Sequence, residues 1–327
     1  MWPSDVMSTG EFSIIERFFT LRRNRKDVVV GVGDDGAVLA VPTGHHLVVS
    51  TDTLVSGTHF FPDIDPEKLA FKTVAVNLSD LAAMGAEPAW MTLAITLPEI
   101  DEDWLDEFAK GLEYASDYYG VSLVGGDTTR GPLSLTVTIH GTVPEGRSLR
   151  RDGAKIGDWI YVTGALGDSG AGLQALYAKE TGAQWQPFID RHLTPKPRLA
   201  AGIALRGIAT AAMDLSDGLS SDLGHILEAS GVGAQIELER VPLNPTLIEL
   251  VGREQALQHA LSSGEDYELL FMVSDSDNGA LSTMMAETGN QAICIGQVVA
   301  GNSITYRQDS EVMSVASTGY NHFEELQ

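Results

Sequence analysis

The sequence predicts a protein of mixed α/β (α+β) class with two domains, and three observations support this prediction. Its 327 residues exceed the usual size of a single domain. Apolar runs typical of strands alternate along the chain with amphipathic segments typical of helices, and some strands follow one another like hairpins. The polar and basic segment 147–155 contains Gly153 and suits a connection between domains. We therefore expect an N-terminal domain over 1–147 and a C-terminal domain over 148–327.

The first half of the chain begins with an amphipathic helix over 11–22, in which apolar residues recur at helical spacing. Two longer helices, near 66–84 and 101–119, each end at a glycine, Gly85 and Gly120, and glycine is a good helix stop. Between and after these helices, runs of apolar and β-branched residues predict strands near 28–32, 46–50, 89–96, 121–124 and 133–141.

The second half repeats this mixture of helices and strands. A strand near 158–163 meets the glycine-rich segment Gly164–Gly170, and a helix follows. Further helices are expected near 197–208, 219–230 and 245–261, and further strands near 209–213, 234–239, 267–273 and 292–299.

The composition is that of an ordinary globular protein, with 43% hydrophobic and 20% charged residues. Its 21 basic and 45 acidic residues give a net charge of −24, which argues against nucleic acid or an anionic membrane surface as a partner. No apolar run approaches the membrane-spanning length of about 20 residues, and we expect no signal peptide. The single cysteine, Cys294, excludes a disulfide within the chain. These features predict a cytoplasmic protein.

Five short acidic segments are scattered along the chain, and at least four of them lie where an apolar, β-branched run stops. Ligands of open α/β sheets bind outside the carboxyl ends of strands, so we expect these carboxylates to converge. Two carboxylates in contact repel each other by roughly 4 kcal/mol at an effective dielectric constant of about 20, and bound cations offset that repulsion. The segments therefore predict a site for hard metal ions and, through them, a phosphate-bearing substrate. They are Gly33–Asp35, Ser50–Thr53, Asn77–Asp80, Gly125–Thr129 and Asp214–Gly218.

The segment Gly31–Gly36 matches the G-x-G-x-x-G pattern of dinucleotide-binding proteins, but we reject that interpretation. Asp34 and Asp35 would face the pyrophosphate, and the following residues, Ala37–Val41, resemble a strand rather than the helix that the motif requires. A turn that presents carboxylates to a metal ion fits better, with a plain tight turn as the alternative.

Two aspartates stand out by their neighbours. Asp52 is flanked by hydroxyl side chains, and oxygen ligands favour Mg²⁺ or Ca²⁺; a strand end with an Asx-type turn is the alternative. Asp80 lies on an apolar helix face, where a carboxylate is costly unless it is paired or bound to metal. In the segment Gly125–Thr129, Asp127 follows a Gly-Gly pair that lets the backbone approach a ligand. In the segment Asp214–Gly218, Ser216 or Asp217 is expected to cap a helix.

These segments, in this order, resemble the thiamine-monophosphate kinases, which are members of the superfamily of aminoimidazole ribonucleotide synthetase and selenide water dikinase. The resemblance extends through nearly the whole chain, from Gly10 to Phe323. Its most specific pieces are Ser50–Val55 with His59, Val76–Ala86, Gly125–Thr129, Asp214–Gly218 and Ser263–Leu269.

The resemblance implies ATP-dependent phosphorylation of thiamine monophosphate to thiamine diphosphate. It also implies a two-domain fold like that of aminoimidazole ribonucleotide synthetase. In that fold the N-terminal domain binds metal and ATP, and its sheet pairs with that of a second copy to form a barrel in a homodimer. The C-terminal domain, an α/β sandwich, closes the active-site cleft.

The resemblance also assigns roles to individual residues. Several Mg²⁺ ions would be held by Asp35, Ser50, Thr51, Asp52, Asp80, Asp127, Asp214 and Asp217. The nucleotide would be contacted by Gly126, Asp127, Ser216 and Arg151, which adjoins Arg150. Thiamine monophosphate would be contacted by His59, Glu265 and Tyr320, although a loop histidine without a role is an alternative for His59. The catalytic residues would be Asp52, Asp127 and Asp217.

We expect direct, in-line transfer without a covalent phospho-enzyme, because a phosphate monoester is already partly ionised near neutral pH and needs no strong general base. Two other interpretations compete. The first is another enzyme of the same superfamily, which makes aminoimidazole ribonucleotide. The relatives that act on selenide or in hydrogenase maturation use a cysteine or selenocysteine near a terminus, and the position of Cys294 disfavours both. A non-catalytic, acidic metal-binding protein would bind metal without any dependence on nucleotide.

Overall fold

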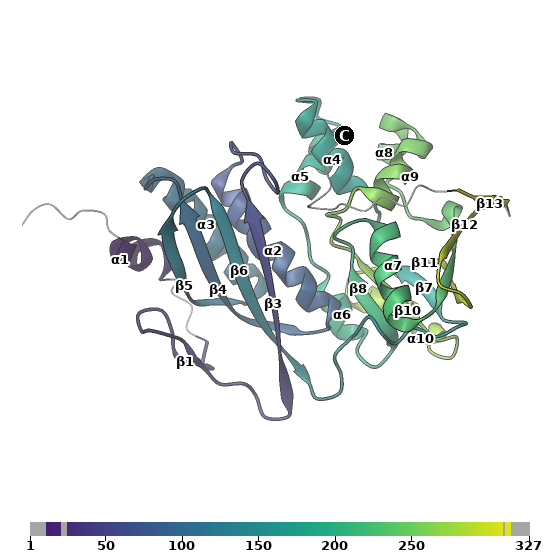
Figure 1. Ribbon diagram of the computed structural model, residues 1–327, viewed down its shortest axis with the longest axis horizontal. Helices are drawn as coiled ribbons and strands as arrows, with labels where there is room; N and C mark the ends of the chain where they lie inside the picture. Colours follow the sequence, from purple (N-terminus) through teal and green to yellow (C-terminus); the bar gives the residue numbers. More distant parts are fainter. Residues whose placement is uncertain (1–10, 21–24, 310, 315–327) are drawn as a thin grey trace, which may run out of the picture. The chain divides into compact units, whose positions relative to one another are not determined.

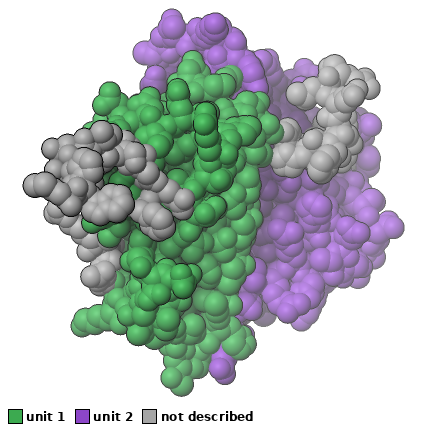
Figure 2. Space-filling view, turned by 60° about the vertical axis from the view of Figure 1, so that its left-hand side comes forward, with its two compact units in different colours: residues 1–78, 88–142 green, residues 79–87, 143–327 purple. Residues whose placement is uncertain are grey.

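The computed structural model describes residues 11–20, 25–309 and 311–314 (Figure 1). Contacts divide the chain into two compact units, coloured separately in Figure 2. Unit 1 comprises residues 1–78 and 88–142, and unit 2 comprises residues 79–87 and 143–327. Both units combine helices with sheets, which confirms the mixed α+β class. The functions predicted for the two domains stay predictions.

Unit 1 is built on a four-stranded sheet with the strand order β3-β6-β4-β5. Helices α2 and α3 lie against one face of it (Figure 1), and on that side the β6 residues Leu135, Val137 and Ile139 are fully buried. Gly111 lets the two helices pack closely, because an added Cβ there would lie 2.2 Å from the Glu67 carbonyl oxygen. The strands and helices are β3 His45–Val55, α2 Pro66–Ala83, β4 Glu87–Leu97, α3 Glu102–Tyr119, β5 Ser122–Arg130 and β6 Ser134–Pro144.

The other face of this sheet, here called the outer face, carries exposed side chains. On β3, Leu47 and Val49 are 45% and 52% exposed. Further along the same strand, the Thr51 hydroxyl donates to the Thr138 hydroxyl oxygen of β6 at 3.0 Å. Within the described residues, neither this sheet nor any other closes on itself, so a single chain contains no barrel.

The remaining elements near the N-terminus are short. Strands β1 Val28–Val30 and β2 Val38–Leu39 pair antiparallel. Because a strand rather than a helix follows Gly36, the rejection of a dinucleotide-binding motif is confirmed. Within the helix expected over 11–22, the described residues form a short α1, Glu11–Ile14, followed by one π-helical turn, Ile15–Phe19, and residues 21 and 22 lie outside the described residues.

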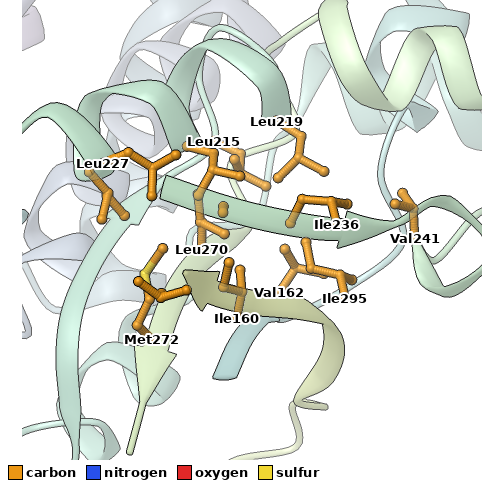
Figure 3. Packing of buried hydrophobic residues seen from close by; sticks show 14 of the residues in the cluster. Ile160, Val162, Leu215, Leu219, Leu227, Ile236, Val241, Leu270, Met272 and Ile295 are labelled. Atoms are coloured by element: carbon orange, nitrogen blue, oxygen red, sulfur yellow. The ribbon is translucent and has the colours of Figure 1, made fainter. Parts of the chain in front are cut away.

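Unit 2 contains a seven-stranded, mostly antiparallel sheet with the order β13-β12-β9-β11-β7-β10-β8. Helix α7 covers a core on one side of it, formed by residues such as Leu219, Leu270 and Ile295 (Figure 3). The strands are β7 Trp159–Val162, β8 Ala209–Asp214, β9 Gly233–Glu237, β10 Leu269–Val273, β11 Ile293–Val299, β12 Ile304–Gln308 and β13 Glu311–Met313.

The helices of unit 2 differ from the expectation in three ways. The helix expected over 245–261 is interrupted at Gly252, whose φ is 83°. The helix expected over 197–208 is only Leu199–Ala204. Helices α5 and α10 were not expected. The full set is α4 Asp168–Tyr177, α5 Gln186–Leu193, α6 Leu199–Ala204, α7 Leu219–Ser230, η2 Leu238–Arg240, α8 Pro245–Val251, α9 Arg253–Ser262 and α10 Asn278–Glu287.

Candidate functional site

In unit 1, Asp52 lies on strand β3 and is half-buried. Its backbone N–H donates to Oδ1 of Asn77 on α2 at 3.1 Å, and the Asn77 amide nitrogen donates to the Thr73 carbonyl oxygen. The fully buried Asn77 therefore ties two of the acidic segments to each other. Side chains alternate along a strand, so Ser50 and Asp52 share the face that buries Leu54, whereas Thr51 points to the outer face.

Asp127 lies on β5, and its side chain belongs to the outer face. Strand register pairs Asp127 with Ala94 of β4, and both residues are exposed. Gly126, immediately before it, has a φ of 154°, and a Cβ at that position would lie 1.8 Å from the Leu93 carbonyl oxygen. Only glycine fits there, because β4 and β5 approach closely and the backbone is left-handed.

The structure does not bring Asp52 and Asp127 together within one copy of unit 1. Their strands, β3 and β5, form opposite edges of the sheet, with β6 and β4 between them. Three inter-strand spacings separate these strands by roughly 14 Å. Asp35 is exposed in the turn between β1 and β2, and its backbone N–H donates to Asp34 Oδ1 at 2.8 Å. The Asp52 and Asp127 carboxylates, on strands this far apart, would bind different ions rather than one.

His59 is half-buried in the turn after β3, and its ring has a defined orientation. Nδ1 accepts a hydrogen bond from the Val55 backbone N–H at 3.0 Å. Because Nδ1 is an acceptor, a neutral ring carries its proton on Nε2. That tautomer makes Nε2 a hydrogen-bond donor, which suits a phosphate oxygen as partner.

In unit 2, the loop Asp214–Gly218 joins the end of β8 to the start of α7. Asp214 is buried, with 4% exposure, whereas Ser216 and Asp217 are half-buried. The expectation that Ser216 or Asp217 caps the helix is wrong. The N-cap residue is Gly218, with a φ of 102° and no side-chain cap. The polar side chains before it are not used as caps.

Asp222, inside the first turns of α7, instead holds the loop that precedes the helix. Its Oδ2 accepts a hydrogen bond from the Asp217 backbone N–H at 3.0 Å, and the residue is fully buried. Burial raises the pKa of Asp222 to about 8; hydrogen bonds from the Asp217 and Ser216 backbone oppose the rise, and the charges of Asp217 and Asp214 add to it. Its Oδ1 is a buried oxygen without a hydrogen-bond partner.

A second loop, Ser263–Glu268, is hydrogen-bonded directly to the first. The Glu265 N–H donates to the Ser216 carbonyl oxygen at 2.8 Å, and the Tyr267 N–H donates to the Leu215 carbonyl oxygen at 2.9 Å. Glu265 and Tyr267 both have left-handed backbones, with φ of 57° and 50°. Such conformations cost roughly 1–2 kcal/mol each for residues other than glycine. The structure thus brings Glu265 next to the predicted metal- and nucleotide-binding loop.

A buried ionic network supports this loop. Glu268, 1% exposed, accepts hydrogen bonds from Thr163, Arg191 and Arg198. The Glu265 carboxylate is held in turn, since Nδ1 of the buried His192 lies 3.0 Å from Glu265 Oε2. The network therefore fixes both the backbone and the side chain of the residue predicted to contact thiamine monophosphate.

Asp266 is buried in the same loop, with 2% exposure. Its Oδ2 accepts from the Gly167 N–H at 2.7 Å and its Oδ1 from the Ser169 N–H at 3.3 Å. Burial raises the pKa of Asp266 to about 7, although these two hydrogen bonds and Arg191 favour the ionised form.

This pKa predicts a pH dependence of stability. The pKa of an unfolded aspartate is about 3.8, so between about pH 4 and 7 the native state keeps a proton that the unfolded chain has released. The native state binds more protons there, so stability falls as the pH rises, by up to about 4 kcal/mol, and the loss is complete above pH 7. We expect urea unfolding from pH 4.5 to 7.5 to show this fall relative to Asp266→Asn. A constant difference in unfolding free energy would contradict it.

The other predicted residues of unit 2 lie apart from these two loops in the chain. Asp80 is half-buried near the end of α2. Arg151 is exposed, whereas the neighbouring Arg150 forms a two-point ion pair with Asp152, with Nε–Oδ1 at 2.8 Å and Nη2–Oδ2 at 2.6 Å. The assignment of Arg151 as the nucleotide contact stays a prediction. Tyr320 lies outside the described residues.

The oxygen donors of the Asp214–Gly218 loop fit Mg²⁺. In the described part of the chain, no three His, Cys, Asp or Glu side chains are grouped so that they hold an ion by themselves. Magnesium is usually bound by one or two carboxylates, with water and substrate phosphates completing its shell. Asp214 and Asp217 offer two such carboxylates. Burial is the main cause of the raised pKa of Asp222, and the charges of Asp217 and Asp214, which add to it, are charges that a cation would offset.

The comparisons with known proteins agree along the whole chain. The family model described as AIR synthase related protein, N-terminal domain, matches residues 33–143, and the model of the C-terminal domain matches residues 155–308. A thiamine-monophosphate kinase from Salmonella typhimurium (strain LT2) is 52% identical over 324 residues, which cover 97% of this chain and 99% of the relative.

Two solved structures are also similar. The crystal structure of thiamine-monophosphate kinase from Stenotrophomonas maltophilia K279a has 41% sequence identity and a TM-score of 0.83, and the match covers 92% of this chain and 96% of that chain. The structure of AaThiL complexed with AMPPCP and TMP has 30% identity and a TM-score of 0.77, and the match covers 99% of this chain and 100% of that chain.

Proposed function

Because this chain belongs to the thiamine-monophosphate kinases, within the AIR synthase related proteins, we propose that it transfers the γ-phosphoryl group of ATP to thiamine monophosphate. The product is thiamine diphosphate, and ATP is the co-substrate. A relative of 30% identity has been solved with AMPPCP and TMP, which supports both substrates.

One observation in the structure carries the proposal. The loop Ser263–Glu268, with Glu265, is hydrogen-bonded along its backbone to the loop that carries Ser216 and Asp217. If Glu265 contacts thiamine monophosphate while Ser216 and Asp217 contact the nucleotide and its metal, donor and acceptor meet at one place. Transfer between two phosphates requires that proximity above all else.

The chain's own residues act mainly by charge and position. Asp52, Asp127 and Asp217 are proposed to hold Mg²⁺, with Asp35, Ser50, Thr51, Asp80 and Asp214 completing the set. Gly126 and Arg151 are proposed to contact the nucleotide, and Tyr320 the thiamine monophosphate. When bound, Mg²⁺ would neutralise phosphate charge and so reduce the repulsion between donor and acceptor.

His59 is proposed to donate Nε2–H to the acceptor phosphate, because its Nδ1 is already an acceptor. The acceptor phosphate itself supplies the nucleophilic oxygen, and its second pKa of about 6 makes a general base unnecessary. Arg151 adds positive charge beside the nucleotide phosphates. The reaction is then a direct, in-line transfer, and no phosphate remains on the protein.

An assay of the purified protein with ATP, Mg²⁺ and thiamine monophosphate tests the function. We expect thiamine diphosphate to appear by chromatography, and to depend on all three components. With ATP labelled in the γ-phosphate, the label should enter the product and none should remain on the protein. Absence of thiamine diphosphate, with aminoimidazole ribonucleotide formed from its ribotide precursor instead, would overturn the proposal in favour of the related synthetase.

A homodimer is the second part of the proposal. The outer face of the unit 1 sheet exposes Leu47 and Val49 beside a row of threonines, a pattern suited to burial against another sheet. The family resemblance implies that two such sheets, one from each copy, pair into a barrel. This pairing would cover the outer face of each sheet.

The dimer predicts a specific effect of a charge on the outer face. Wild-type protein should have twice the chain mass of 35.0 kDa by light scattering. Val49→Lys should convert it to monomer, because pairing the two sheets would bury the lysine charge without an assigned partner. Ile156→Lys, at an exposed aliphatic residue of unit 2, should remain dimeric. A dimeric Val49→Lys variant would exclude this face as the interface.

A cytoplasmic location completes the proposal, because ATP is supplied there and a chain with one cysteine forms no internal disulfide. Among the helices of the described residues, none combines the length and apolarity needed to span a bilayer.

A further inference from the structure

The loop Ser263–Glu268 contains a buried carboxylate to which the proposed reaction gives no role. Asp266 lies between the left-handed residues Glu265 and Tyr267, and its side chain contacts the protein interior. We propose that Asp266 is a positioning residue for thiamine monophosphate: by capping α4 it holds the backbone that directs Glu265 toward the acceptor substrate. This rests on the proposed function, in which Glu265 contacts that substrate.

The first support is the pairing of Asp266 with the start of α4. The N-cap residue of α4 is Gly167, which has no side chain to cap the helix. Asp266 supplies the missing acceptors: Oδ2 accepts from the Gly167 N–H at 2.7 Å, and Oδ1 from the Ser169 N–H at 3.3 Å. A carboxylate at this end of a helix also interacts favourably with the helix dipole.

The second support is the backbone on either side of Asp266. Residues 265 and 267 donate their N–H groups to the carbonyl oxygens of Ser216 and Leu215, and the Asp266 carbonyl oxygen accepts from Arg191 Nη2 at 2.8 Å. A left-handed backbone at residues other than glycine persists only where several contacts hold it. The side chain of Asp266 anchors the middle of this stretch, so its loss is expected to release Glu265.

The third support is the glycine-rich segment Gly164–Gly170, which is shaped around the loop. A Cβ added to Gly164 would lie 2.6 Å from the carboxyl carbon of Glu268, and one added to Gly170 would lie 2.2 Å from the Ser263 Cβ. These glycines therefore allow the loop to approach the start of α4 closely enough for Asp266 to cap it.

Kinetics of Asp266→Asn at pH 8, above the Asp266 pKa of about 7, test the proposal. Asparagine keeps one acceptor oxygen but turns an N–H donor toward the second helix N–H. We expect the KM for thiamine monophosphate to rise about tenfold, while the KM for ATP changes less than about twofold. Calorimetric titration of thiamine monophosphate without ATP should show the same loss of affinity.

Asp168→Asn is the matched control. Asp168 lies in the same first turn of α4, and its Oδ2 accepts from Asn244 rather than from the loop. Its variant should leave both KM values unchanged. Equal changes of both KM values in Asp266→Asn, unchanged values, or the same selective rise in the control would each overturn the proposal. Turnover by the wild-type protein tests the proposed function separately, because the inference concerns only the ratio of the KM values of the variant and the wild-type protein.

A second variant keeps the proposal testable if Asp266→Asn does not fold. Arg191→Lys retains the positive charge beside Glu268 but loses the forked guanidinium that also reaches the Asp266 carbonyl oxygen. We expect a rise in the KM for thiamine monophosphate of about threefold, with the KM for ATP unchanged. A folded Arg191→Lys protein with both KM values unchanged would contradict the role of this loop.

Discussion

Asp127→Asn is expected to lower turnover by about a hundred- to a thousandfold without changing the fold, because the lost charge is one that offsets phosphate charge during transfer. In the single chain, Asp127 is exposed on the outer face of the unit 1 sheet, so its side chain contributes nothing to the core of that chain. Asparagine matches its size and keeps an oxygen ligand. Steady-state kinetics at saturating Mg²⁺, with thermal melting of the same preparation, measure the two effects separately.

The same substitution at Asp52 should act in the same direction, because the proposal gives Asp52 an equivalent task on another strand. Glu113→Gln is a matched control, since Glu113 is an exposed carboxylate on α3. It should leave both turnover and melting unchanged. Near-wild-type turnover of Asp127→Asn at saturating Mg²⁺ would remove Asp127 from the proposed site, whatever the behaviour of Asp52.

Gly126→Ala is expected to destabilise unit 1 by about 3 kcal/mol or more, the range of severe steric and backbone defects. The added Cβ would lie 1.8 Å from the Leu93 carbonyl oxygen, and the φ of 154° is unfavourable for alanine. Either β4 and β5 must separate or the strand must change its path, and both changes move Asp127. Denaturant unfolding monitored by circular dichroism gives the free energy of unfolding.

The neighbouring residue provides a strict control. A Cβ on Gly125 would meet only the Thr92 Cγ2, at 3.9 Å, which is an ordinary van der Waals distance. Gly125→Ala should therefore cost little stability, although both variants replace a glycine by alanine on the same strand. Similar unfolding free energies for the two variants would show that the close approach of β4 and β5 does not constrain residue 126.

Local signals in the sequence predicted the long helices of this protein well. The helix expected near 66–84 is Pro66–Ala83, and Gly85 after it has a φ of 65°. The helix expected near 101–119 is Glu102–Tyr119, with Asp101 as N-cap and Gly120 in the left-handed region. These boundaries depend on residues within one turn of the helix end, so they can be read from the chain alone.

Side chains with distant partners were not predicted correctly. The helix start at 219 suggested Ser216 or Asp217 as its cap, whereas the N-cap is Gly218 without a side-chain cap. Asp222, inside the helix, instead accepts a hydrogen bond from the Asp217 N–H of the preceding loop. Asp266 and Glu268 gave a weak signal, because they lie within three residues before the apolar strand β10 and so require buried partners. Nothing in the sequence identifies Arg191 as a partner of Glu268 or His192 as a partner of Glu265.

The sequence by itself determined the fold class, the family, the kind of ligand and the oxygen-rich residues expected to bind it, because these follow from patterns and motifs carried by short segments. Only the tertiary structure decided that Asp52 and Asp127 lie on opposite edges of one sheet, and that the Glu265 loop is hydrogen-bonded to the Asp214–Gly218 loop. Strand order and long-range hydrogen bonds join residues that are far apart in the chain. No local pattern of residues records which of them will meet.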